Sequence, residues 1–453
     1  MQSLNPATGE PLAEYDELTR EELEARLALA AEAFGQWRRV PIESRCELVG
    51  NVSGALKANR ERLARLMTDE MGKPIRDARG EIDKCAWVCE HYAANAPMYL
   101  ADEPAATDAV SSAVVFRPLG VILAVMPWNF PFWQVMRFAA PALAAGNVGL
   151  LKHASNVPGC ALAIEEVFAE SGFPPGAFAT LLVGSAAVEG VIADQRVAAV
   201  TLTGSTSAGR AVARAAGDRL KKSVLELGGS DPYVILADAD LEAAAEACAT
   251  ARLINSGQSC IAAKRFVVVD DVRAEFETLL TARMASAVVG DPTAETTEVG
   301  PLARADLRDE LHDQVLRTVA AGARLTLGGE VPMGPGAFYP PTVLADVPPG
   351  SAAYTEELFG PVAAIIPAAD ERDAIRIAND SVFGLGAAVF TTDVQRGARI
   401  AADELEAGSC FVNAFVRSDP RLPFGGVKES GYGRELASHG IREFVNVKTV
   451  YVA

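Results

Sequence analysis

The stretch that decides the fold is Val121-Ile-Leu-Ala-Val-Met126, which runs directly into Pro127-Trp-Asn-Phe-Pro131. All six residues of the first run are apolar, so both faces of a strand built from them would be buried. Such a run is typical of an inner strand of a parallel sheet. The two prolines then bracket a rigid turn. The segment therefore predicts a buried strand followed by a fixed loop.

Short apolar runs after this strand repeat its pattern. Strands are expected at 148–152, 179–183, 197–203 and 223–227, with helices between them at 159–171 and 206–216. This alternation of strand and helix predicts a doubly wound parallel sheet. A second α/β segment is expected to have strands at 231–236, 264–269 and 363–367, and helices at 241–254, 274–287 and 371–378, the last capped by Asp370.

The two ends of the chain differ in character. Residues 1–100 are expected to be mainly helical, with a capping box at Thr19 and Glu22 and further helices over 42–71 and 74–99. Residues 444–452 favour a strand that is apolar on both faces. Such a strand needs a partner, which either another subunit or this chain's own sheet can supply.

Composition restricts the class of partner. The 453 residues allow two or three domains, and 59 acidic against 41 basic residues give a net charge of −18. This charge disfavours nucleic acid and anionic membranes as main partners. No apolar run is long enough to span a bilayer, the N-terminus lacks the features of a secretory signal, and the seven cysteines are scattered. We therefore expect a cytoplasmic protein with free thiols.

Cys260 is the candidate nucleophile. It follows Asn255-Ser-Gly, a turn composition, so it is expected on a loop that presents it to a cleft. A lone cysteine is more often a small buried apolar residue. Glu226 is the candidate base, because a carboxylate inside an apolar strand has a raised pKa; a strand-end ion pair is the alternative. None of the four histidines lies in a catalytic motif.

Two turns offer polar groups to the same chemistry. The Asn129 side chain is suited to donate to a developing oxyanion, or else it forms an Asx turn with its own backbone. Thr203-Gly-Ser-Thr-Ser-Ala-Gly209 is a strand-to-helix turn of small residues that suits a phosphate group. Cys85, Cys89 and His91 superficially suggest a metal site, but no second cluster supplies further ligands, so core packing is favoured and no metal is expected.

Six motifs together carry a family resemblance. They are Pro127–Pro131, Leu202-Thr-Gly-Ser205, Leu225-Glu-Leu-Gly-Gly229, Gly257-Gln-Ser-Cys260, Glu356-Glu-Leu-Phe-Gly-Pro-Val362 and Pro423-Phe-Gly-Gly426. In this order, the set resembles the NAD(P)-dependent aldehyde dehydrogenases over essentially the whole chain. Gly257–Arg265 and Leu151–Ser155 are most similar to the shorter bacterial succinate-semialdehyde dehydrogenases.

The resemblance implies a covalent mechanism. Cys260 would attack the aldehyde, Asn129 and the Cys260 backbone N–H would hold the oxyanion, and Glu226 would activate the water that hydrolyses the thioester. For the cofactor it implies Trp128, Lys152, Ser155, Gly204, Ser205, Leu227, Glu357 and Phe359. Ser155 stands where NAD-preferring relatives often carry an acidic residue, so NADP is expected to be preferred and NAD remains possible.

For the substrate, the resemblance implies that Arg137 binds the distal carboxylate of succinate semialdehyde, with Trp133 and Ser418 in the same tunnel. A helix-surface arginine is the alternative reading of Arg137. Some family members carry a second arginine where this chain has Ile254. Another semialdehyde or an aliphatic aldehyde therefore remains an alternative substrate. A CoA-acylating enzyme is disfavoured by Glu226, and a catalytically silent protein is a further alternative.

The resemblance also implies an architecture. A Rossmann-like cofactor domain would comprise 1–100 and 119–228, and an α/β catalytic domain 229–436. A small β oligomerisation element would combine 101–118 with 437–453. Homodimers and homotetramers are usual for the family.

Overall fold

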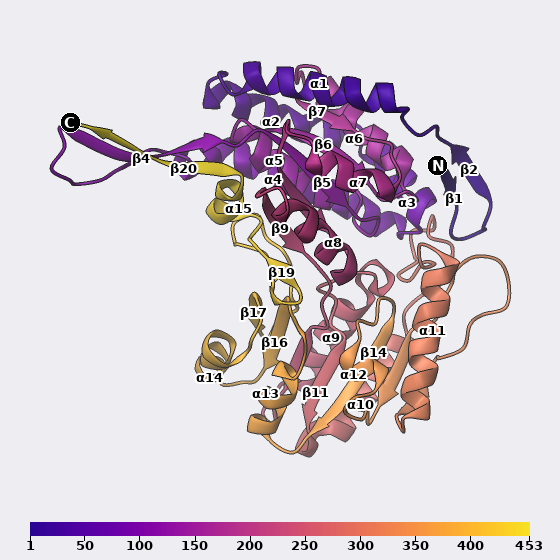
Figure 1. The fold of residues 1–453 in the computed structure, drawn as a ribbon. Helices are drawn as coiled ribbons and strands as arrows, with labels where there is room; N and C mark the ends of the chain where they lie inside the picture. The colour runs from indigo at the N-terminus through magenta and orange to yellow at the C-terminus, as the bar shows by residue number, and fades with distance from the viewer.

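The computed structural model describes all residues, Met1–Ala453, as two lobes and a projecting arm (Figure 1). The first lobe is built on a six-stranded sheet of order β19-β9-β8-β5-β6-β7, parallel except for β19. Its strands are β5 (Val121–Met126), β6 (Val148–His153), β7 (Phe178–Thr180), β8 (Val197–Thr203), β9 (Lys222–Glu226) and β19 (Gly431–Tyr432).

Helices surround this sheet. They are α1 (Arg20–Trp37), α2 (Ile42–Ala58), α3 (Arg60–Met71), α4 (Ile75–Tyr99), α5 (Trp133–Ala144), α6 (Pro158–Glu170), α7 (Val188–Ala193) after the short η1 (Ser185–Ala187), α8 (Thr206–Gly217) and α15 (Ala437–Glu443). A hairpin of β1 (Gln2–Leu4) and β2 (Pro11–Glu14) precedes them. The predicted capping box at Thr19 is confirmed, since the Glu22 N–H donates to the Thr19 hydroxyl and the Glu22 carboxylate accepts from the Thr19 N–H.

The second lobe has a seven-stranded sheet of order β12-β13-β14-β11-β10-β16-β17. Its strands are β10 (Pro232–Ile235), β11 (Arg265–Val269), β12 (Arg324–Leu327), β13 (Thr342–Ala345), β14 (Val362–Ala368), β16 (Gly386–Phe390) and β17 (Ser409–Val412), with a separate pair of β15 (Phe383–Gly384) and β18 (Val427–Lys428). Its helices are α9 (Leu241–Leu253), η2 (Ile254–Gly257), α10 (Asp270–Ala285), α11 (Ala305–Ala320), α12 (Ala352–Thr355), α13 (Glu371–Asn379), α14 (Val394–Arg399) and η3 (Ile400–Glu404).

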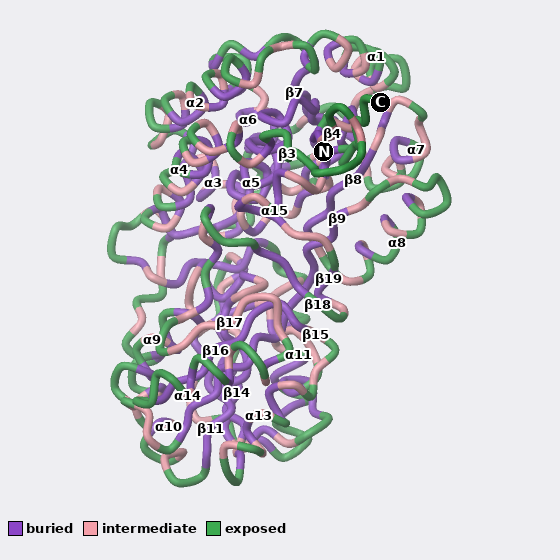
Figure 2. Tube along the Cα trace, turned by 90° about the vertical axis from the view of Figure 1, so that its left-hand side faces the viewer, coloured by how far each residue is buried: buried purple, intermediate pink, exposed green.

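Alternation along the inner strands divides the apolar side chains of the second lobe. Val234 of β10 belongs to one buried cluster, whereas Tyr233 and Ile235 belong to another. Successive side chains of a strand point to opposite faces, so each face of the sheet has its own core. Figure 2 shows the inner strands of both lobes buried and the arm exposed. No helix has both the length and the apolar character that crossing a membrane requires.

The arm consists of β3 (Glu103–Pro104), β4 (Ser111–Pro118) and β20 (Val445–Val452). β20 pairs antiparallel with β4 of the same chain over its whole length, from Val445 opposite Pro118 to Val452 opposite Ser111. The intrachain alternative for the tail is therefore the one observed. The other edge of β20 has no partner strand, and seven of its eight residues are exposed.

The structure agrees with several expected elements and corrects others. β5 and β8 begin and end where expected, and Asp370 caps α13 by accepting from the Asp373 N–H. The single helix expected over 42–71 is two helices, because Asn59 leaves helical geometry between α2 and α3. The chain also returns to the first lobe near its end, where β19 pairs with β9 and α15 packs against α4 and α5. The domain limits themselves stay a prediction.

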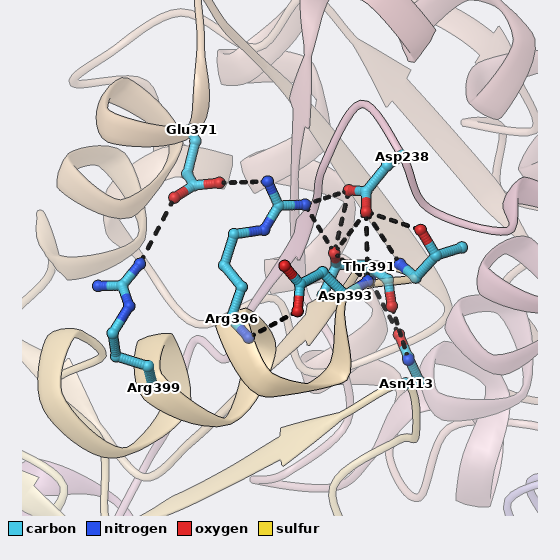
Figure 3. A network of polar contacts seen from close by, with 8 residues as sticks. Asp238, Glu371, Thr391, Asp393, Arg396, Arg399 and Asn413 are labelled. Atoms are coloured by element: carbon cyan, nitrogen blue, oxygen red, sulfur yellow. Dashed lines mark hydrogen bonds and ion pairs between the residues drawn. The ribbon is translucent and has the colours of Figure 1, made fainter.

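A polar network in the second lobe ties the ends of two strands together (Figure 3). The Asp238 carboxylate, which follows β10, accepts from the hydroxyls of Thr391 and Thr392 at 2.8 Å and forms an ion pair with Arg396. Burial alone would raise the pKa of Asp238, but these donors and the Asp393 N–H outweigh it and lower the pKa to about 2. Every oxygen of this carboxylate therefore has a partner.

Candidate active site

The loop that carries Cys260 has an unusual backbone. α9 ends at Leu253, and the next residues include three in a row with left-handed φ: Asn255 at 53°, Ser256 at 55° and Gly257 at 78°. Such angles are strained for side chains other than glycine. At Gly257 a side chain would also lie 2.3 Å from the carbonyl of Gly360. The loop is therefore held in this shape by its surroundings.

Hydrogen bonds from three directions hold the loop. The Asn255 amide donates to the Asn129 carbonyl at 2.7 Å, and the buried Arg252 guanidinium donates to the Gly257 carbonyl at 2.6 Å. The Ser256 hydroxyl accepts from the Gly300 N–H at 2.9 Å. Strained backbone that is fixed by its neighbours is common at catalytic loops, where it presents one side chain.

Cys260 lies in a cavity of about 500 Å³ between the two lobes. The walls come from the loop after β5, the turn between β8 and α8, the end of β9, helix α11 and the segment around Glu357. Beneath Cys260, the Lys264 ammonium donates to the carbonyls of Ser259 and Cys260 at 2.8 and 2.7 Å and lies 3.3 Å from Glu357. Glu357 also accepts from the Gly229 N–H at 3.1 Å.

Burial favours the thiol form of the Cys260 side chain. Burial raises its pKa to about 12, and the positive charges of Lys264 and Arg137 offset only part of that rise. Because the thiolate is the nucleophile, the proton must leave when substrate is attacked. This requirement makes a nearby proton acceptor part of the chemistry.

Asn129 is placed to serve an oxyanion. Its side-chain oxygen accepts from Gln134 at 3.1 Å, and its amide nitrogen donates to the Gln258 carbonyl at 3.0 Å. The second amide hydrogen has no partner among these bonds. The side chain therefore does not form the alternative Asx turn, and both of its bonds fix its orientation beside Cys260.

Glu226 ends β9, where it pairs in register with Thr203 of β8. Its side chain is only 2% exposed, and neither carboxylate oxygen has a hydrogen-bond partner. Burial and the nearby Glu435 raise its pKa well above the ordinary value, against the opposing charges of Arg137 and Arg434. No ion pair reaches it, so the strand-end salt bridge is not what the structure shows, and the state of the group suits a general base.

The Glu226 carboxylate rests away from the cavity walls. The neighbouring Leu227 and Gly228 line the cavity, whereas Glu226 does not. One of its carboxylate oxygens instead lies against Gly425, so close that a Cβ atom added there would be 2.6 Å away. To reach Cys260 the carboxylate must therefore rotate about its side-chain bonds.

Most of the expected cofactor residues lie together. Those lining the Cys260 cavity are Trp128, Gly204, Ser205, Leu227, Glu357 and Phe359. The rings of Trp128 and Phe359 meet edge to face at 5.7 Å, and Ser205 caps α8 by accepting from the Ala208 N–H. A turn of small residues at a helix N-terminus is a suitable place for a phosphate. These groups fit a nicotinamide dinucleotide.

Lys152 and Ser155 lie apart from these residues, at the end of β6. Lys152 is half-buried and burial lowers its pKa, whereas Ser155 is exposed. Ser155 lines a second cavity, of about 460 Å³, together with Asn156 and Arg304. This position is consistent with the far end of an extended cofactor.

Arg137 is buried in α5 and is only 3% exposed, so the helix-surface reading is wrong. It forms an ion pair with Glu435 and lies 4.7 Å from the centre of the Phe424 ring. Its charge therefore already has a partner in this structure, and its role toward substrate stays a prediction. Trp133 and Ser418 are both buried and meet at Lys84.

Sequence reasoning missed several groups here. Gln134, Lys264, Glu435 and the cavity-lining residues of α11 were not expected. Lys264 stands four residues after Cys260 and borders an apolar strand, which was the one local signal available. Cys85 and Cys89 are buried in the core of the first lobe, and no group of three or more His, Cys, Asp or Glu side chains could hold a metal ion.

Comparison with known proteins decides the family. Residues 1–450 match the model of the aldehyde dehydrogenase family. The chain belongs to the aldehyde dehydrogenase family. Among its relatives, succinate-semialdehyde dehydrogenase [NADP(+)] 1 of Mycobacterium tuberculosis strain ATCC 25618 / H37Rv is 50% identical over 454 residues, covering 100% of this aldehyde dehydrogenase and 99% of the relative.

Two further comparisons agree with this assignment. Succinate semialdehyde dehydrogenase [NAD(P)+] of Escherichia coli strain K12 is 49% identical over 449 residues, covering 99% of this aldehyde dehydrogenase and 97% of the relative. The crystal structure of succinic semialdehyde dehydrogenase from Streptococcus pyogenes in complex with NADP+ superposes with a TM-score of 0.97 at 39% identity, covering 100% and 99% of the two chains.

Proposed function

We propose that this aldehyde dehydrogenase oxidises succinate semialdehyde to succinate with NADP+, through a covalent adduct on Cys260. The observation that carries the proposal is the cavity in which Cys260, Asn129 and the cofactor-binding candidates meet. The substrate and the cofactor follow the names of relatives that share about half of their residues with this chain over its full length.

The first half of the reaction forms a thioester. The Cys260 thiol loses its proton to water as its sulfur bonds to the aldehyde carbon, and the oxygen that becomes negative accepts from the free Asn129 amide hydrogen and the Cys260 backbone N–H. The nicotinamide cofactor supplies the hydride acceptor. Loss of hydride from the substrate carbon leaves an acyl group on sulfur, with two electrons transferred.

The second half releases the acid. The Glu226 carboxylate, turned from its rest position, takes a proton from a water molecule that attacks the thioester carbon. The C–S bond breaks, the acid leaves, and the Cys260 sulfur takes up the proton that Glu226 held, which restores the thiol and the Glu226 carboxylate. A carboxyl whose pKa is raised by burial is a better proton acceptor than an ordinary glutamate. The presence of this group favours hydrolysis over transfer to CoA.

The cofactor preference rests on Ser155. Its exposed hydroxyl, three residues after Lys152, leaves room for a 2′-phosphate, whereas a carboxylate there would repel one. NADP+ is therefore the preferred cofactor in this proposal, and NAD+ is accepted less well.

The substrate end of the site comprises Arg137, Trp133 and Ser418 in this proposal. Arg137 contributes positive potential near Cys260, whose thiol pKa it lowers. A fixed positive charge favours an aldehyde that carries a distal carboxylate over an uncharged aldehyde of equal length.

We further propose that the protein is a homodimer or homotetramer joined through its arm, in the cytoplasm. Val447 and Tyr451 of β20 are 61% and 51% exposed on a strand with a free edge. A second copy that covered this edge would bury apolar surface and pair its backbone. The seven cysteines are all free, as in a reducing compartment.

A kinetic panel tests the proposal. Succinate semialdehyde, glutarate semialdehyde and butanal are each assayed with NADP+ and NAD+, and the highest kcat/KM is expected for succinate semialdehyde with NADP+. Ser155→Glu should lower kcat/KM for NADP+ about 100-fold while NAD+ changes little. Equal efficiency with butanal would refute the substrate, and equal efficiency of wild type with NAD+ would refute the cofactor preference.

A further inference from the structure

Lys84 of α4 is a largely buried cation with no role in the site described so far. Its ammonium donates to the Ser418 hydroxyl at 2.7 Å and lies 4.2 Å from the centre of the Trp133 ring. Burial, assisted by the charge of Arg137, lowers its pKa to about 8. Three segments far apart in the sequence therefore converge on this one charge.

The carboxylates near Lys84 are engaged elsewhere. Glu81, one turn earlier on α4, forms an ion pair with Lys73 and accepts from the N–H groups of Phe132 and Trp133 at 2.9 Å. Asp419, next to Ser418, is bound by both sides of the Arg421 guanidinium at 2.9 and 2.6 Å. No carboxylate lies within ion-pair distance of Lys84 itself. The protein desolvates this ammonium without giving it a counter-ion, which is costly unless a ligand supplies one.

Lys84 lies beside the segment that forms the aldehyde site. Trp133, whose ring it contacts, is the first residue of α5, and the next residue, Gln134, lines the Cys260 cavity and bonds to Asn129. Arg137, one turn further along α5, lies close enough that its charge lowers the pKa values of both Lys84 and Cys260. The first turn of α5 therefore contacts Lys84 through Trp133 and reaches the cavity of Cys260 through Gln134.

We propose that Lys84 is a specificity-determining residue that binds the distal carboxylate of the substrate. The inference rests on the proposed function and deepens it. Ser418 accepts from Lys84 and still has its own O–H to donate to a carboxylate oxygen, while Trp133 forms a flat apolar wall. Arg137 is less suited to be the sole partner, because it already forms an ion pair with Glu435.

The decisive experiment compares two four-carbon aldehydes on the full-length enzyme with NADP+. Lys84→Met should lower kcat/KM for succinate semialdehyde about 30-fold, mainly through KM, because the loss of one partner of a desolvated ion pair weakens binding strongly. For butanal the same change should be less than about twofold. The matched control is Lys57→Met on the neighbouring α2. It removes an exposed lysine that pairs with Glu90 of α4, and it should leave kcat/KM for both aldehydes unchanged.

The outcomes separate the two proposals. A wild-type enzyme that does not prefer succinate semialdehyde over butanal refutes the proposed function. A wild-type enzyme that does prefer it, with the preference intact in Lys84→Met, refutes the role of Lys84 alone. Equal losses on both aldehydes in Lys84→Met also refute it, because they indicate a structural role.

A second variant keeps the test independent of folding. Lys84→Arg retains the charge and should keep KM for succinate semialdehyde within about threefold of wild type at pH 7. Above pH 8 the wild-type KM should rise as the ammonium loses its proton, whereas the variant's KM should not. The charged or titratable groups facing Lys84 are Glu81 and Cys85 of α4, Arg137 of α5 and Asp419. Parallel pH profiles for wild type and Lys84→Arg would overturn the assignment.

Discussion

Asp238 and Glu226 are two carboxylates at the ends of parallel strands in different lobes, and they differ in their hydrogen-bond donors. Asp238 comes just after β10 and accepts from the hydroxyls of Thr391 and Thr392 and from Arg396. Glu226 ends β9, more deeply buried, and neither of its oxygens accepts a hydrogen bond. The pKa is accordingly lowered to about 2 at Asp238 by its donors and raised well above the ordinary value at Glu226 by burial.

The difference separates what stabilises this protein from what it uses for chemistry. A carboxylate with all its donors in place contributes to the folded state and is inert toward protons near neutral pH. A buried carboxyl without donors costs stability and is kept poised to accept a proton. The strained loop before Cys260 likewise costs stability and serves the chemistry of the site. Mutations of Asp238 should therefore change the free energy of unfolding, whereas mutations of Glu226 and Cys260 should change turnover.

The largest expected effect is at the nucleophile. Cys260→Ser should lower kcat about 1,000-fold or more, because a serine hydroxyl is not activated for thioester chemistry in this site. The melting temperature should stay close to that of wild type, since the side chain makes no hydrogen bond. Steady-state NADPH formation and differential scanning fluorimetry measure the two effects. Retained turnover, or an acyl group trapped on another residue, would rule out Cys260.

Glu226→Gln should lower steady-state kcat about 100-fold while leaving one rapid turnover intact. Hydride transfer does not require this base, so rapid mixing should still show a burst of NADPH near one equivalent per site. Stability should not fall, because a buried carboxyl without donors is replaced by a neutral amide. Asp238→Asn is the matched control and should leave kcat unchanged. Loss of the burst would place Glu226 in the first half-reaction instead.

The Asp238 network should respond in the opposite way. Asp238→Ala should lower the free energy of unfolding by about 2 kcal/mol, because several donors lose their acceptor. Catalysis by the folded enzyme should stay within about twofold of wild type. Urea unfolding followed by tryptophan fluorescence and kcat at a temperature where both proteins are folded test this. A lower kcat in Asp238→Ala without a lower free energy of unfolding would contradict the view that Asp238 serves stability and not catalysis.

The smallest expected effect is the pH dependence of that stability. The pKa of Asp238 is about 2 in the folded protein against an ordinary value of 3.8, so its contribution is fully present above pH 4. It should be lost as the pH falls from 4 toward 2, because protonation then favours the unfolded chain. Subtracting the acid unfolding curve of Asp238→Asn from that of wild type isolates this contribution. Parallel curves would show that Asp238 titrates normally.

The sequence was informative wherever a signal was local. An uninterrupted apolar run predicted β5 to the residue, and a run of apolar residues and threonines did the same for β8. The caps at Thr19 and Asp370 followed from side chains three residues from their partners. The motif order was enough to assign the family. No helix was placed at α5 among the expected elements; every one of its residues is buried, so no exposed polar face marks it.

The parts of the site that the sequence did not predict depend on distant partners. Arg137 meets Glu435 almost 300 positions later, and Lys84 meets Ser418 334 positions later, so only the assembled lobes bring these groups together. Local patterns contain no information about such pairs. The same limit applies to the left-handed loop 255–257, which contacts with Asn129, Gly300 and Gly360 hold in place.

The pairing of Thr203 with Glu226 has a consequence for insertions and deletions. Because side chains alternate along a strand, adding or removing a single residue within β9 would turn Glu226 to the opposite side of the sheet. The sheet could still close around such a slipped strand, yet the enzyme would then hold its acyl group with no residue able to release it. Length, as much as identity, is therefore constrained in this five-residue strand.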